Sequence, residues 1–99
     1  MKKTFPLQAP GKDDARVRDK IRHEVNKYLR RSRRKPPQEG CRGWEFACRL
    51  GESEASATTL PLSEVAAGID RVAAAGAKQV YVELIAVPAR RIPPPESVG

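Results

Sequence analysis

Apolar residues recur at helical spacing through residues 14–34, and this pattern most constrains the fold of the chain. The stripe advances by three or four residues and consists of Val17, Ile21, Val25, Tyr28 and Leu29. Such spacing predicts one long amphipathic helix whose apolar stripe packs on a core. Asp13 or Asp14 can cap its first turn, and the two prolines at 36 and 37 end it.

The opposite face of this helix is cationic. At about 100° per residue, six side chains fall in a band about 80° wide, and Arg31 lies a little outside it. The six are Arg16, Lys20, His23, Lys27, Arg30 and Arg34. Residues 12–35 hold eleven Lys and Arg but four Asp and Glu, and this difference equals the formal net charge of +7. All excess positive charge therefore lies on one segment, which indicates a polyanionic partner.

A row of cations favours nucleic acid, because each neutralised phosphate releases condensed counterions and arginine can bind two phosphate oxygens at once. The competing interpretation is a well-solvated basic helix, since Lys and Arg are common at solvent-facing positions and helix C-termini. A sheet that stacks bases carries aromatic residues on its first and third strands, where this chain has only Phe5. We therefore expect contact with the phosphate backbone or with nucleic-acid shape. Membrane binding is disfavoured, because the core needs the apolar face of the helix.

Four strands and a second helix complete the expected elements. Patterns of period two predict strands over 3–8, 44–50, 58–62 and 78–87, and helical spacing predicts a helix between Ser63 and Gly76. The order β-α-β-β-α-β predicts an α+β fold of the ferredoxin-like, split βαβ type, with two helices on one face of a four-stranded, mainly antiparallel sheet. That arrangement places the last strand at an edge, although 78–87 is apolar on both faces. The strand is either more central or covers its open face with a partner.

Few groups are placed for chemistry, so we expect no enzymatic activity and no cofactor. Asp19 and His23 have the spacing of a carboxylate–imidazole pair, but no nucleophile accompanies them. Glu83 is the one charge in an apolar strand, and marks either a carboxylate with a raised pKa in a pocket or the solvent side of an edge strand. Cys48 is expected in the core, and Cys41 lies in a linker. Two cysteines and one histidine are too few for a structural zinc site, so we expect no metal.

The chain has 99 residues, 39% of them hydrophobic, which suits one folded domain. We expect that domain over 1–90 and a disordered, Pro-rich tail over 91–99, where three prolines follow one another. No apolar run approaches the roughly 20 residues that span a bilayer. The start, "MKKTFPLQ", lacks the apolar segment of a secretory signal. The expected location is therefore the cytoplasm, with no membrane partner.

Several stretches together resemble a family of small uncharacterised bacterial proteins that begin "MKKTFPLQ". The other matching pieces are the helix from "IRHEVNKYLRR" to "RRK", the strand "WEFAC" and the later "YVELIAVPAR". The resemblance extends over residues 1 to about 91 and implies a bacterial, cytosolic domain of unknown function. It brings no catalytic or binding residues to this chain.

The cationic face supplies the functional hypothesis. We expect non-enzymatic binding of nucleic acid, with RNA or ribonucleoprotein favoured on fold type alone. The expected contacts are Arg16, Lys20, His23, Lys27, Arg30, Arg31 and Arg34. One alternative is a protein-interaction or assembly module, or a homodimer, that uses the apolar C-terminal strand. A weaker alternative is a small-molecule or enzymatic site around Glu83.

Overall fold

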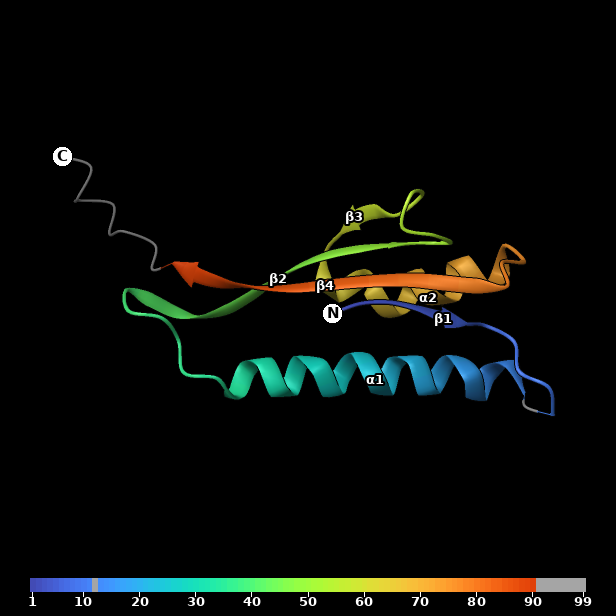
Figure 1. Ribbon diagram of the computed structural model, residues 1–99, viewed down its shortest axis with the longest axis horizontal. Helices are drawn as coiled ribbons and strands as arrows, with labels where there is room; N and C mark the ends of the chain where they lie inside the picture. The colour runs from blue at the N-terminus through green and yellow to red at the C-terminus, as the bar shows by residue number, and fades with distance from the viewer. Residues whose placement is uncertain (12, 91–99) are drawn as a thin grey trace.

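The computed structural model describes residues 1–11 and 13–90, which form two α-helices and a four-stranded sheet (Figure 1). In chain order the elements are β1 Lys2–Pro6, α1 Asp14–Arg34, β2 Cys41–Gly51, β3 Thr58–Leu60, the 3₁₀ helix η1 Leu62–Glu64, α2 Val65–Ala74 and β4 Gln79–Arg90. The α+β class and the order β-α-β-β-α-β are thereby confirmed. The tail expected over 91–99 lies outside the described residues.

The last strand, β4, lies inside the sheet and not at its edge. The strands are ordered β1-β4-β2-β3, and each neighbouring pair is antiparallel. β1 and β2 therefore run parallel with β4 between them, and β3 and β4 run parallel with β2 between them, so both crossovers are split βαβ units. Of the two explanations for an apolar β4, the central position is correct. Neighbours on both sides and helices on one face bury its Val80, Val82 and Leu84 completely.

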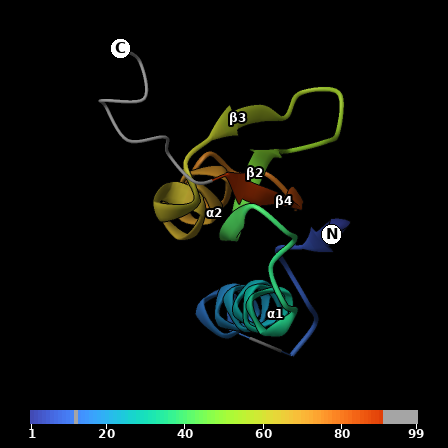
Figure 2. The ribbon, with the colours of Figure 1, turned by 90° about the vertical axis from the view of Figure 1, so that its left-hand side faces the viewer.

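Both helices cover the same face of the sheet (Figure 2). The residues of this face meet in register: Phe5 pairs with Val80, Leu50 with Val82, and Cys48 with Leu84. All six are buried, together with Val65 and Ile69 from α2. The apolar residues that alternate along the strands and those that recur every 3.6 residues along the helices thus pack against each other in one apolar layer.

Helix α1 begins and ends where the sequence indicates. The carboxylate of its N-cap, Asp13, accepts a hydrogen bond from the Ala15 amide at 3.4 Å. At its other end Lys35 has an extended backbone, as a residue before proline prefers. The buried residues of α1 are Val17, Ile21, Val25, Leu29 and Ser32. The expected stripe therefore faces the core, and the opposite side of α1 faces solvent.

Strands β2 and β4 continue together beyond the other two strands. β3 pairs only with residues 48–50 of β2 and β1 with residues 79–83 of β4, whereas β2 and β4 pair from Cys41 and Arg90 to Gly51 and Tyr81. The resulting two-stranded ribbon, residues 41–47 and 85–90, runs towards the C-terminal end of α1 (Figure 1). There the Trp44 indole donates a hydrogen bond to the Lys35 carbonyl at 3.0 Å. The ribbon thus fixes the position of the most basic part of the chain.

Candidate functional site

The seven expected contact residues lie on the solvent side of α1, and we call them the outer face. All seven are exposed: Arg16, Lys20, His23, Lys27, Arg30, Arg31 and Arg34. They face outward because the apolar stripe on the opposite side of α1 is buried. At a rise of 1.5 Å per residue, the row from Arg16 to Arg34 is about 27 Å long. This length corresponds to about eight phosphate steps of one nucleic-acid strand.

No member of the outer face forms an ion pair with another residue in 1–11 or 13–90. The cations on the flank of α1 differ, because α2 brings Asp70 beside them. The Asp70 carboxylate lies 3.2 Å from Arg18 Nε and also bonds to Arg22, which reaches Asp19 at 2.7 Å. The flank is therefore neutralised within the protein, whereas the described residues leave the positive charge of the outer face available.

The charge is densest in the last turn of α1. Cations there oppose the negative end of the helix dipole, so the dipole stabilises them. One of these cations contacts an aromatic ring: the guanidinium of Arg33 lies 5.7 Å from the ring centroid of Phe46. The Phe46 ring also packs edge-on against Tyr28. The first of these contacts holds Arg33 towards the ribbon, while Arg30, Arg31 and Arg34 remain on the outer face.

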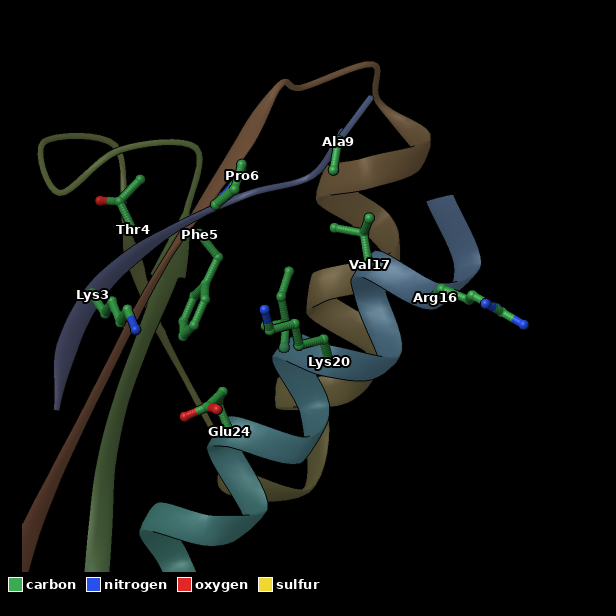
Figure 3. A pocket seen from close by; sticks show the side chains of 10 residues that line it. Lys3, Thr4, Phe5, Pro6, Ala9, Arg16, Val17, Lys20 and Glu24 are labelled. Atoms are coloured by element: carbon green, nitrogen blue, oxygen red, sulfur yellow. The ribbon is translucent and has the colours of Figure 1, made fainter. Parts of the chain in front are cut away.

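A groove of about 520 Å³ lies between β1 and α1, beside the outer face (Figure 3). Its apolar walls include Phe5, Val17 and Ile21. Arg16 and Lys20 line it too and so belong to both the groove and the outer face. The remaining lining residues are Lys3, Thr4, Pro6, Ala9 and Glu24. Its volume lies in the range of small-molecule sites in proteins, about 300–1,000 Å³.

Glu83 anchors a polar network on the open face of the sheet, the face that carries no helix. Its Oε1 accepts a hydrogen bond from the Tyr81 hydroxyl at 2.8 Å and one from Arg49 Nη1 at 3.3 Å. The hydrogen bond from Tyr81 lowers the pKa of Glu83, desolvation opposes this shift, and the charge of Arg49 lowers the pKa further. Both expectations for Glu83 are therefore wrong: its pKa is not raised, and its strand is not at an edge.

The loop over residues 52–57 covers this network on the side away from the helices (Figure 2). Arg49 Nη2 donates to the carbonyls of Glu54 and Ala57 at 3.3 and 3.2 Å. The loop leaves β2 at Gly51, where an added Cβ would lie 2.7 Å from the Ala57 Cα. Burial and the hydrogen bond to the carboxylate raise the pKa of Tyr81 to about 12.

The other side chains considered for catalysis or metal binding do not come together in a site within the described residues. Asp19 pairs with Arg22, and His23 is exposed, so the two do not form the carboxylate–imidazole pair that their spacing allows. Cys48 lies in the core, as expected, and burial raises the pKa of its thiol. Within the described ranges, no three His, Cys, Asp or Glu side chains gather to hold a metal ion. The helices of those ranges include none with the length and hydropathy needed to cross a bilayer.

Comparison with known proteins places the chain in a family. A model described as a family of unknown function, DUF6172, matches residues 1–93. The chain belongs to this family. DUF6172 membership confirms the expected resemblance to a domain family of unknown function. No curated protein and no solved structure matches the chain.

Proposed function

We propose that this DUF6172 protein binds nucleic acid, without catalysis, through the outer face of α1. One observation carries the proposal: seven exposed cationic or titratable side chains form a row, and none is paired within the described residues. Like charges three or four residues apart destabilise a helix by about 0.2–0.5 kcal/mol per pair. Solubility alone does not require that cost, because acid–base pairs at the same spacing also keep a surface polar. Bound phosphates would offset the repulsion among these cations, because each phosphate attracts the cations beside it.

RNA or ribonucleoprotein is the favoured partner, and a cytoplasmic setting belongs to the same proposal. The preference for RNA rests on the α+β fold type and not on a base-reading motif. The open face of β1 presents Lys2 and Thr4, which offer no ring on which a base could stack. Contacts along the outer face are therefore expected to be with phosphates, largely independent of sequence.

Salt dependence tests this proposal directly. Fluorescence anisotropy with labelled RNA and DNA would measure Kd between 50 and 200 mM salt. If about six phosphates are engaged, log K falls against log salt with a slope near −5, and affinity drops by about three decades over this range. A slope near zero, or binding that is absent at low salt, would refute the proposal.

A second candidate is a homodimer, and the ribbon of β2 and β4 favours it. Within the described residues, no strand pairs with the outer edge of 41–47 of β2 or with that of 85–90 of β4. Val87, on the open face of the ribbon, is the one exposed large hydrophobic residue among them. Unpaired strand edges are templates for pairing with another chain. The unpaired edges, together with the exposed Val87, are therefore the reason to keep this candidate.

Light scattering over a wide concentration range tests the dimer. A dimer that dissociates in the variant Val87→Glu would support it, because the charge would be buried in the interface. A monomer at every concentration would exclude it.

A further inference from the structure

We infer that the groove between β1 and α1 receives a base of single-stranded nucleic acid while the outer face holds the phosphates. This inference rests on the proposed function and extends it, because it selects a single strand over a duplex. Arg16 and Lys20 belong to both surfaces. A strand whose phosphates follow α1 therefore passes along the mouth of the groove.

The groove suits a flat and largely apolar group. Phe5, Val17 and Ile21 are buried core residues, and the groove exposes the edge of the layer that they form. Figure 3 shows the Phe5 side chain pointing from β1 towards α1, so that its ring forms part of the wall. Every nucleobase has a π-face that can stack on an aromatic ring, so such a wall accepts bases without selecting their sequence.

In the free protein Lys3 lies over one face of the Phe5 ring, and Phe5 itself is 7% exposed. The Lys3 ammonium lies 5.0 Å from the ring centroid, in the range of a cation–π contact. A stacked base would replace this ammonium over the ring. The long side chain of Lys3 could then turn to the phosphate of the same nucleotide, so the positive charge would be used and not lost.

Charge favours a nucleotide over a neutral or cationic ligand. Lys3, Arg16 and Lys20 line the groove, and Glu24 is the one acidic side chain among its lining residues. The lining thus carries a net positive charge beside apolar walls. An apolar ring with an attached phosphate matches both properties.

A duplex cannot use the groove, because its bases are paired and stacked inside the double helix. An unpaired base enters such a site at little cost, whereas extruding a paired base costs a few kcal/mol of unstacking. Single strands should therefore gain affinity from the groove that duplexes do not gain, although both bind the outer face.

Anisotropy with three labelled ligands of equal length tests this: a single-stranded RNA, an abasic strand with the same phosphates, and an RNA duplex. The RNA strand should bind about tenfold more tightly than the abasic strand, which is the lower range for one stacked base. The variant Ala9→Leu, which adds bulk to the lining of the groove, should reduce this difference and leave duplex binding within about twofold. Ala67→Leu, on an exposed part of α2 outside the groove, is the matched control and should change neither.

The two hypotheses fail in different ways. Equal affinity for the RNA and abasic strands would overturn the groove and leave the proposed function standing. If no strand binds even at low salt, the proposed function fails instead. In that case, titrating the unmodified protein with adenosine 5′-monophosphate, ribose 5-phosphate and inorganic phosphate tests whether the groove binds a base.

That titration follows the NMR signals of Phe5, Val17 and Ile21 and needs no variant to fold. Adenosine 5′-monophosphate should shift all three with a Kd near the millimolar range, and the two ligands without a base should leave them unchanged. Equal shifts with inorganic phosphate would mean an anion site only, and no shift at about 10 mM nucleotide would mean no site; either result overturns the inference.

Discussion

The outer face of α1 and the open face of the sheet both carry charged side chains, but those side chains are paired on only one of the two surfaces. On the open face, the Glu83 carboxylate accepts hydrogen bonds from Arg49 and Tyr81 beneath the 52–57 loop. On the outer face, no ion pair forms within the described residues. Charges that bond to each other stabilise the fold in which they meet. Unpaired charges in water gain no such bonds, so the comparison attributes a stabilising role to the sheet face, and it is consistent with the binding role that we propose for the helix face.

Neutralising the outer face should give the largest effect and break the comparison most directly. The fourfold variant Lys27→Gln, Arg30→Gln, Arg31→Gln and Arg34→Gln removes most of the phosphate contacts. We expect affinity for nucleic acid to fall at least about a hundredfold, with the salt slope reduced by about 4. Anisotropy would measure both quantities, and circular dichroism would show that the fold is retained.

The matched control removes four cations elsewhere: Lys2→Gln, Arg42→Gln, Arg71→Gln and Lys78→Gln. All four residues are exposed and lie outside α1, so the net charge falls equally. Affinity in this control should remain within a few-fold of the unmodified protein. Equal losses in the two variants would show that only net charge matters and would remove the outer face as the site.

Removing Glu83 should affect stability and not binding. In Glu83→Ala the buried Tyr81 hydroxyl and Nη1 of the half-buried Arg49 lose their acceptor, at a cost of about 1–3 kcal/mol in the free energy of unfolding. Urea unfolding would measure it. Glu45→Ala, which breaks an exposed pair with Arg42 on β2, should cost less than about 1 kcal/mol. Loss of nucleic-acid binding in Glu83→Ala, with the fold intact, would contradict the assignment.

The free energy of unfolding should depend on this network at both acid and alkaline pH. The pKa of Glu83 is lowered in the fold, so its contribution is complete above the unfolded value of about 4.5 and is lost as pH falls through the folded value. The pKa of Tyr81 is raised to about 12, so its contribution is complete below the ordinary value near 10 and is lost as pH rises towards 12. Urea midpoints across pH should show both losses; Glu83→Gln should lack the acid one and Tyr81→Phe the alkaline one. Unchanged profiles in both variants would mean that the network does not set them.

Freeing the flank of α1 should give the smallest effect and sharpen the comparison. In Asp70→Asn, Arg18 and Arg22 lose the carboxylate that neutralises them. Affinity for nucleic acid should rise roughly threefold, because additional cations reach the phosphates. Stability should change by less than about 1 kcal/mol, since these pairs are partly exposed. A decrease in affinity would show that Asp70 positions the helix and does not merely neutralise its flank.

The parts of the molecule that sequence analysis predicted depend on neighbours along the chain. The stripe from Val17 to Leu29 and the Asp13 cap follow from spacing alone, so α1 and its exposed face could be read directly. The position of β4 could not, because strand order is decided by pairing between distant residues. The partner of Glu83 lies 34 residues away at Arg49, and only the alternation of Tyr81 with Glu83 hinted at a polar site on the open face. The groove depends on how β1 and α1 are spaced, which no local pattern records.

The interleaved strand order also dictates how the chain can acquire its structure. β4 is the last strand made, yet it separates β1 from β2, which are the first two. A nascent chain that has released α1 therefore has at most the short β2–β3 pair to receive the apolar stripe until residues 79–90 emerge. Sheet formation must close loops of up to about 80 residues in one late step, which predicts slow, all-or-none folding. Until then the exposed stripe is open to chaperones, and a fragment that ends before β4 lacks the strand that joins β1 to β2.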